Sequence, residues 1–253
     1  MDTPDQVVTV GQYAWVANLN GGMLTEFGPD SGHFVRTVNP KKSNFQFGGY
    51  LVPNNIHLWY LCLTNNSLIE LNGISGKVIR RIPLPPITDP GYIALVDNHV
   101  WVASETSNAL LELNASSGHL TRSLVADYKG GTFSMTVYDG DVWVDGGMVV
   151  EELNGDTGAP IRTVRAVDDD LGGGFGISGG GGSIWVLNEN RNLLTELDAS
   201  NGSLVRIVTE KVGRFSNPRD VAYRNGDVWI VNSGSNSVSE IDAANGKLLR
   251  YLW

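Results

Sequence analysis

Asp145, Arg219 and Asp220 are the residues of this 253-residue sequence that are best suited to acid–base chemistry. Asp145 stands in the apolar phrase DVWVDGG, two residues after Trp143. If Asp145 is buried without a partner, its pKa is raised and it can act as an acid or a base. If the following loop exposes it to water, it is an ordinary carboxylate. Arg219 and Asp220 are neighbours that offer a cation and an anion together. We therefore predict that these three residues are catalytic.

Two other sequence patterns match known catalytic or cofactor-binding motifs, but the segments around them do not have the structure that these motifs require. The segment GFGISGG contains G-x-G-x-x-G, from Gly174 to Gly179, and G-x-S-x-G around Ser178. Each motif functions where a strand turns into a helix, whereas a strand-like segment follows here. The single cysteine, Cys62, excludes an intramolecular disulfide framework and a cysteine-based zinc cluster. Neither a dinucleotide site nor a serine nucleophile is expected.

Six tryptophans reveal the internal repeat that must position these residues. They are spaced 44, 42, 42, 42 and 44 residues apart, at Trp15, Trp59, Trp101, Trp143, Trp185 and Trp229. Each repeat contains four short segments of alternating apolar and polar residues, separated by Gly, Asn and Asp turns. A period near 42 with four strands per repeat is typical of β-propeller blades.

The predicted fold class is therefore all-β, a six-bladed β-propeller with four antiparallel strands per blade. The whole chain, 1–253, is expected to form one domain. Its blades are predicted at approximately 6–39, 48–84, 91–125, 132–166, 174–210 and 218–253. No helix is expected, because no segment shows helical periodicity over ten residues. Each blade supplies its own four strands, so the ring is expected to close by packing alone, with a seventh blade from another chain as the alternative.

The repeats resemble the YVTN/NHL-type propellers, including the virginiamycin B lyase-like group. The resemblance covers nearly the whole chain and rests on the phrases VWVASETSNALLELNASSG, IWVLNENRNLLTELDASNG and VWIVNSGSNSVSEIDAANG. It implies the propeller fold, while the functions of the superfamily extend from lyases and hydrolases to scaffolds. For the virginiamycin B lyase-like group it further implies histidines on the top face and a divalent metal.

The positions of the four histidines depart from that pattern. In a four-stranded blade the top rim carries the loops between blades and those between the second and third strands, and the bottom rim carries the other turns. His57 and His99 begin second strands, and His33 and His119 lie at the turns before fourth strands. All four histidines are therefore expected at the bottom rim.

Residues common to all six repeats are expected to belong to the scaffold. Each third strand has a Glu and each fourth strand has an Arg ten residues later, so the two should face each other across the hairpin as a solvated outer ladder. The pairs are Glu26–Arg36, Glu70–Arg80, Glu112–Arg122, Glu152–Arg162, Glu196–Arg206 and Glu240–Arg250. The repeated tryptophans are expected to pack between blades.

Function is expected at the top rim, because loops on a rigid scaffold vary freely. Residues nine or ten positions before each tryptophan should ring the channel mouth, and four blades place an aromatic residue there. The predicted substrate-binding residues are Tyr50, Tyr92, Phe133, Phe175, Asn188 and Asn232. A mostly apolar pocket with a few polar groups is the usual design of a small-molecule site. The alternative is that many of these side chains pack under loops.

No cofactor is predicted and no residue is assigned as a metal ligand. The alternative is a Ca²⁺ or Mg²⁺ ion held by oxygen ligands of the rim, where Asp168–Asp170, Asn188, Glu189 and Asn232 gather.

Composition narrows the class of partner. Asp and Glu exceed Lys and Arg by 27 to 18, a net charge of −9, which argues against a nucleic-acid-binding protein. No apolar run is long enough to span a membrane, and the first residues, MDTPDQ, do not form a signal peptide. We expect a cytoplasmic monomer that acts on a small-molecule substrate, unless a signal was removed from the chain.

Together these features favour a small-molecule enzyme with a top-face central pocket. Its chemistry is predicted to be of the lyase, cyclase or pericyclic type, on an apolar or aromatic metabolite. Hydrolysis by a catalytic triad is not expected, because the top rim has no histidine. The alternative is a non-catalytic propeller that binds a ligand or a protein partner through the same face. A closed pocket favours the enzyme, and an open channel with a flat polar rim favours the scaffold.

Overall fold

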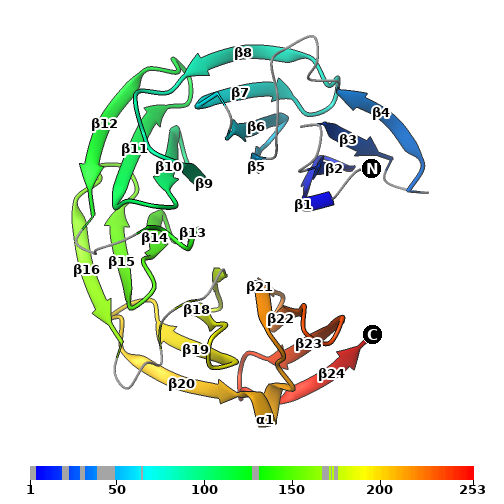
Figure 1. Cartoon of the computed structure of the whole chain (residues 1–253), viewed down its shortest axis with the longest axis vertical. Helices are drawn as coiled ribbons and strands as arrows, with labels where there is room; N and C mark the ends of the chain where they lie inside the picture. The colour runs from blue at the N-terminus through cyan, green and yellow to red at the C-terminus, as the bar shows by residue number, and fades with distance from the viewer. Residues whose placement is uncertain are drawn as a thin grey trace. The chain divides into compact units, whose positions relative to one another are not determined.

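A computed structural model of the protein describes residues 4–18, 23–28, 32–38, 49–63, 65–126, 131–166, 171, 173 and 176–253. The described residues form six antiparallel sheets of four strands each, and in every sheet the strands follow one another in sequence order (Figure 1). Each sheet corresponds to one predicted blade, so the all-β class and the six four-stranded blades are confirmed. Phe175 and Asp168–Asp170 lie outside the described residues.

The strands of the first three blades have the following bounds. Blade one contains β1 (Pro4–Val10), β2 (Tyr13–Asn18), β3 (Leu24–Phe27) and β4 (Phe34–Val38). Blade two contains β5 (Gly49–Asn54), β6 (His57–Cys62), β7 (Ser67–Asn72) and β8 (Val78–Pro83). Blade three contains β9 (Pro90–Val96), β10 (His99–Ser104), β11 (Ala109–Asn114) and β12 (Leu120–Val125).

The last three blades repeat the pattern. Blade four contains β13 (Ser134–Tyr138), β14 (Asp141–Asp145), β15 (Val149–Asn154) and β16 (Pro160–Arg165). Blade five contains β17 (Ile177–Gly180), β18 (Ser183–Asn188), β19 (Leu193–Asp198) and β20 (Leu204–Thr209). Blade six contains β21 (Pro218–Arg224), β22 (Asp227–Asn232), β23 (Ser237–Asp242) and β24 (Leu248–Leu252). The short helix α1 (Glu210–Gly213) was not expected, because four residues are too few to show a helical period.

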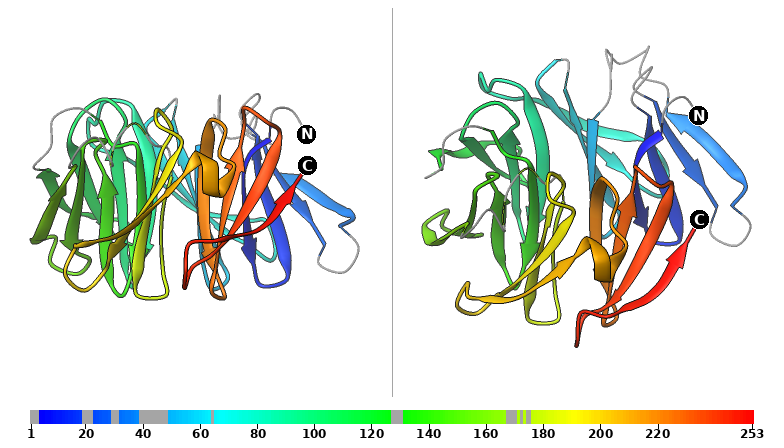
Figure 2. Two further views of the ribbon diagram at one scale, coloured as in Figure 1. Left: turned by 90° about the horizontal axis from the view of Figure 1, so that it is seen from below. Right: turned by 60° about the horizontal axis from the view of Figure 1, so that its bottom comes forward.

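The chain divides into two compact units. Unit 1 comprises Met1–Thr106 and Leu111–Thr121, and unit 2 comprises Ser107–Leu110 and Arg122–Trp253. In unit 1 the inner strand β5 contacts both β1 and β9, and in unit 2 the inner strand β17 contacts both β13 and β21. Within each unit the strands of neighbouring blades run between two rims, where the turns gather (Figure 2). We keep the names top rim and bottom rim for these, as defined above for a single blade.

The repeated tryptophans lie in the interior of the blades. Trp15, Trp59, Trp101, Trp143 and Trp185 are almost completely buried. Trp15 also contacts the next blade: its Nε1–H donates a hydrogen bond to the carbonyl oxygen of Gly73 at 2.8 Å. Its core cluster contains residues of both blades, among them Leu51 and Tyr60. The predicted packing of tryptophan between blades is thus confirmed for blade one.

The paired Glu and Arg residues face each other as predicted, but the ladder is not solvated. Five of the pairs are in register, for example Glu26 with Arg36 and Glu70 with Arg80. The Glu26 side chain is 0% exposed, and desolvation raises its pKa, an effect that the charge of Arg36 opposes. The glutamates are buried because each arginine covers its glutamate and shields it from water.

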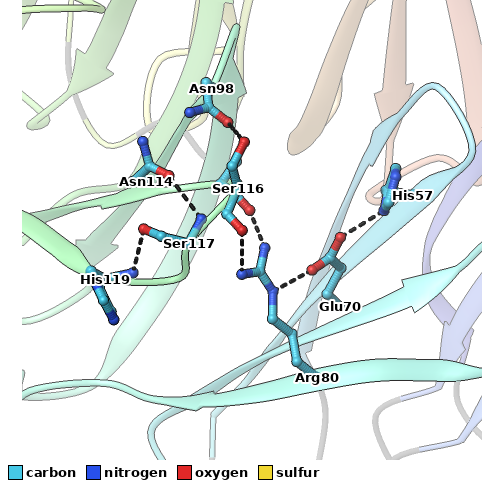
Figure 3. A network of polar contacts seen from close by, with 9 residues as sticks. His57, Glu70, Arg80, Asn98, Asn114, Ser116, Ser117 and His119 are labelled. Carbon is cyan, nitrogen blue, oxygen red and sulfur yellow. Dashed lines mark hydrogen bonds and ion pairs between the residues drawn. The ribbon is translucent and has the colours of Figure 1, made fainter.

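The arginines of this ladder also connect successive blades. Arg80 donates from Nη1 to the carbonyl oxygen of Ser116 at 2.8 Å and from Nη2 to that of Ala115, both in the turn of the next blade (Figure 3). Arg36 and Arg206 make equivalent bonds to the turns of the blades that follow them. The ion pairs of Arg36, Arg80 and Arg206 therefore link neighbouring blades as well as neighbouring strands.

Glycines in the turns before the fourth strands leave room for the arginines of the preceding blades. Gly76 has a φ of +71°, and a Cβ atom there would lie 2.9 Å from Cδ of Arg36. A side chain at this position would therefore strain the backbone and displace the arginine of the preceding blade. Gly118, Gly202 and Gly246 repeat the positive φ and the close approach to an arginine.

The glycine-rich stretch of blade five has a packing role. Gly179 and Gly180 lie in β17, and Tyr rings from the two neighbouring inner strands cover them. A Cβ atom on Gly179 would lie 2.4 Å from Cβ of Tyr138, and one on Gly180 would lie 1.9 Å from Cδ1 of Tyr223. The hydroxyl of Ser178, in the same strand, accepts a hydrogen bond from the Tyr223 backbone N–H at 3.0 Å. These residues therefore join blade five to its neighbours.

Replacing Gly180 by alanine is expected to destabilise the protein by about 1–3 kcal/mol, because the added methyl group overlaps the Tyr223 ring. Gly28→Ala is the matched control, since its Cβ would meet nothing closer than Val35 Cγ2 at 3.7 Å. Urea denaturation of both variants measures the difference. Equal midpoints for the two would contradict this account of the glycine strand.

Candidate functional site

Asp145 ends strand β14 at the top rim of blade four and is completely buried. It pairs with Ser134 of β13, and its side chain is 0% exposed. Oδ1 accepts a hydrogen bond from the Gly147 backbone N–H at 2.8 Å, whereas Oδ2 has no hydrogen-bond partner among the described residues. Desolvation raises the pKa of this carboxyl group well above its ordinary value, against the smaller opposing effect of the Gly147 bond. The structure thus places Asp145 in the buried environment, not the exposed one.

The loop after Asp145 explains how an acid comes to be buried there. Gly146 N–H donates to the carbonyl oxygen of Val149 at 2.8 Å, which closes a tight turn between β14 and β15. Gly147 has a φ of +84°, and a Cβ there would lie 3.0 Å from the Phe133 ring. Phe133 N–H in turn donates to the carbonyl oxygen of Asp145 at 2.7 Å. Phe133, a predicted substrate-binding residue, is therefore a close neighbour of Asp145.

Arg219 and Asp220 lie at the start of β21, also at the top rim. Arg219 does not pair with Asp220: its Nη2 lies 3.1 Å from Oε1 of Glu189 in the preceding blade. Asp220 is exposed, and its Oδ1 accepts a hydrogen bond from the Val221 N–H at 2.9 Å. The surrounding protein raises the pKa of the Asp220 carboxyl through partial desolvation. Arg219 thus forms an ion pair with Glu189, and Asp220 stands as a separate carboxylate.

Asn188 and Asn232 are buried, and their amides are engaged in the fold. The Asn188 side-chain oxygen accepts a hydrogen bond from the Arg191 backbone N–H at 3.0 Å. The Asn232 oxygen accepts one from the Ser216 N–H at 3.2 Å, and its amide donates to Ser239 Oγ at 2.9 Å. Both residues stand three positions after a tryptophan and hold loops of the top rim. Their assignment to substrate binding remains a prediction.

Tyr50 and Tyr92 lie together at the top rim of unit 1. Their ring centroids are 5.1 Å apart, with the planes inclined by 36°. The Tyr50 hydroxyl donates to Oε1 of Glu105 at 3.5 Å. Gly91 makes room for this carboxylate, because a Cβ on Gly91 would lie 1.8 Å from Cγ of Glu105. The predicted aromatic pair is thus a cluster of two rings and one acid.

Glu105 and Glu189 are top-rim residues whose contacts the sequence analysis missed. Each stands four residues after a repeated tryptophan, Trp101 and Trp185, and each contacts a neighbouring blade. Aligning the repeats at this position shows an acid in blades three and five. This recurrence could have predicted the contacts between blades, because an acid at that edge of a blade can reach the first strand of a neighbouring blade.

Cavities also open at the bottom rim. One of about 430 Å³ lies between blades two and three and is lined by Asn54, His57, Trp59, Glu70, Ile79, Arg80, Asn98, Ala115 and Ser116. One of about 300 Å³ lies between blades four and five. His57 begins β6 and His99 begins β10, and each directs Nδ1 to the ladder glutamate of its own blade at 2.6 Å. Both histidines thus lie at the bottom rim, as expected.

Among the residues that the structure describes, no group of three or more His, Cys, Asp and Glu side chains is arranged to hold a metal ion. Within the same part of the chain, no helix has the length and apolar character needed to cross a membrane.

No protein-family model and no curated protein sequence matches the chain. Two solved structures resemble it over 99% of its length, a streptogramin B lyase and the virginiamycin B lyase of Staphylococcus aureus. Each comparison has a TM-score of 0.82 at 16% sequence identity, and the matches cover 83% and 84% of the two lyase chains. An identity this low carries the fold but not the substrate or the active site. The chain therefore has the six-bladed β-propeller fold that it shares with these two lyases.

Proposed function

We propose that this protein is a small-molecule enzyme that carries out lyase- or cyclase-type chemistry at the top rim. The observation that carries the proposal is the carboxyl group of Asp145, which is buried with Oδ2 unpartnered. The position is occupied by Ala17, Leu61, Ala103, Leu187 and Val231 in the other blades, so the fold does not need an acid there. A buried acid without a structural partner destabilises a protein and is characteristic of functional sites.

In this proposal, two carboxyl groups of unit 2 serve as the base and the acid that an elimination requires. In such a step a base removes a proton from carbon, the electron pair forms a double bond, and the bond to the leaving group breaks as that group takes a proton. Asp220, exposed at the rim, is the proposed base. Asp145, whose carboxyl pKa is raised by burial, is the proposed acid. We propose that a shift of the Gly146–Gly147 turn brings this carboxyl group to the substrate. Arg219 stabilises the negative charge that develops on the substrate.

The likeness to two lyases supports this class of reaction. A lyase of this kind needs neither a histidine nor a serine nucleophile in principle, because acid–base pairing and positioning supply the catalysis. We propose an apolar or aromatic substrate, because the Phe133 ring lies beside the turn that follows Asp145.

The purified protein is expected to convert at least one member of a panel of apolar and aromatic small molecules, virginiamycin B included, as measured by chromatography with mass spectrometry. Arg219→Ala is expected to lower kcat by about 10²-fold or more, because it removes a group that stabilises transition-state charge. Arg224→Ala is the matched control: it removes the same charge from the bottom end of the same strand, β21, and should leave turnover unchanged.

Two outcomes would contradict the enzyme assignment. Binding of a panel member without conversion would identify the protein as a non-catalytic binding propeller. Equal turnover by the Arg219→Ala and Arg224→Ala variants would show that the chemistry does not use the top rim of blade six.

A further inference from the structure

We propose that Asp141 and Glu152 share a proton at the bottom rim of blade four, and that this acid pair makes the blade a pH-sensitive element of the fold. The two residues line the cavity of about 300 Å³ between blades four and five. The other lining residues are Tyr138, Asp139, Trp143, Arg162, Gly182, Ala199 and Ser200. The cavity lies within unit 2 and is separate from the top-rim residues proposed for catalysis.

Comparison of the blades shows what is unusual about this pair. The residue two positions before the repeated tryptophan contacts the ladder glutamate in several blades. In blades two and three it is a histidine, His57 or His99, and in blade five it is Ser183, whose Oγ donates to Glu196 Oε1 at 2.7 Å. Figure 3 shows the arrangement in blade two, with His57 and Arg80 on either side of Glu70. Blades four and six instead have an acid, Asp141 and Asp227, and in blade six Arg250 contacts both carboxylate oxygens of the ladder glutamate, Glu240.

Two carboxyl groups can form that hydrogen bond only if one of them holds a proton. The pKa of Glu152 is raised to about 7, mainly by burial; the charge of Arg162 lowers it, and the charge of Asp141 and its hydrogen bond to Glu152 raise it. Asp141 is itself fixed by Asn154, whose amide donates to Asp141 Oδ1 at 3.3 Å. One shared proton therefore replaces the donor that histidine or serine supplies elsewhere.

The arginine of this blade is also less completely bound than its counterparts. Arg162 Nε contacts Glu152 Oε2, but Nη1 of Arg162 is buried with no hydrogen-bond partner among the described residues. The equivalent arginines of blades two and five donate to carbonyl oxygens of the next blade. Arg162 Nε thus contacts one oxygen of Glu152, whereas Arg250 of blade six contacts both carboxylate oxygens of Glu240.

The groups around Glu152 determine its titration. Asp141 faces it from β14 and Arg162 from β16, while Asp139 and Tyr138 contribute from the turn and strand before β14. From blade five the cavity is lined by Gly182, Ala199 and Ser200, none of which carries a charge. Arg162 is thus the one positive side chain among the residues that line the cavity.

The direction of the pH effect follows from linkage. Glu152 has a pKa near its ordinary value of 4.5 in the unfolded chain and about 7 in the folded protein, so folding favours the protonated form. The resulting stabilisation is fully present below pH 4.5 and is lost as the pH rises to 7 and beyond. Asn at position 141 can donate to an ionised Glu152, so Asp141→Asn should lower this pKa and reduce the loss.

Thermal unfolding at pH 5 and pH 8 tests the proposal. The wild type is expected to lose at least ~3 °C more in Tm between these values than Asp141→Asn does. Asp227→Asn is the matched control, because it removes the same charge at the same position of blade six, where Arg250 contacts both carboxylate oxygens of Glu240. The control should keep the wild-type pH dependence. Equal pH dependence of Asp141→Asn and wild type would overturn the proposal.

A direct titration makes the test independent of overall stability. The carboxyl carbon of Glu152, assigned by its absence in Glu152→Gln, is followed by ¹³C NMR against pH. Its midpoint is expected near 7 in the wild type and at least one pH unit lower in Asp141→Asn. A wild-type midpoint near 4.5 would refute proton sharing.

Discussion

Replacing Asp145 by leucine is expected to produce a protein that is more stable than the wild type and catalytically inactive. The carboxyl group is 0% exposed with one oxygen unpartnered, and leaving a polar group buried in this way costs about 1–3 kcal/mol. Leu61 and Leu187 occupy the same position in blades two and five and are fully buried. The free energy of unfolding from urea denaturation at pH 7.5 and the turnover assay measure the two effects.

The gain from Asp145→Leu should grow with pH. The folded-state pKa of Asp145 is raised above its ordinary value of 3.8, so the wild type loses stability as the pH rises above that value, while the variant does not lose this contribution. Leu187→Asp is the reciprocal control, because it buries an acid at the same position of blade five and should destabilise the protein. A destabilised Asp145→Leu variant would show that the acid has a structural partner.

The second large effect is expected from breaking the ladder in blade two. Arg80→Met should destabilise the protein by about 3 kcal/mol, because it leaves the buried Glu70 carboxylate without its main counter-charge and removes two bonds to the next blade. Equilibrium denaturation in urea gives the magnitude. Arg81→Met, one residue further along β8 and exposed, is the control and should change stability by less than about 0.5 kcal/mol.

The double variant Glu70→Leu/Arg80→Met distinguishes the cost of an unpaired Glu70 charge from the loss of the Arg80 bonds to the next blade. A buried ion pair can be replaced by apolar side chains at little cost, whereas removal of one partner strands a charge. The double variant should therefore recover most of the stability lost by Arg80→Met. If it is no more stable than the single variant, the bonds from Arg80 to the turn of the next blade dominate the energy of this connection.

The repeat made the fold predictable from the sequence. A tryptophan every 42 to 44 residues marks the second strand of each blade, and the turns follow at similar offsets from it. The facing of Glu and Arg was predictable for the same reason, since a ten-residue spacing across a turn determines the register. Burial of the glutamates was not, because their exposure depends on the arginine side chains and on the turn of the next blade.

The candidate site was only partly predictable. Asp145 was identified by its departure from the repeat, but its burial depends on the two-glycine turn and on Phe133, which local pattern does not reveal. Glu105 and Glu189 were missed as partners because their contacts, to Tyr50 and Arg219, are made between blades and far apart in the sequence. The acid pair of blade four was not predicted, because Asp141 and Glu152 approach each other across adjacent strands and not along the sequence.

The turnover rate of the double variant Asp145→Asn/Arg219→Ala tests the functional account most directly. With a substrate found in the panel, the account predicts that kcat falls by at least about 10³-fold relative to the wild type, while the far-ultraviolet circular dichroism spectrum is unchanged. Wild-type turnover by this variant would contradict the assignment of catalysis to the top rim of unit 2.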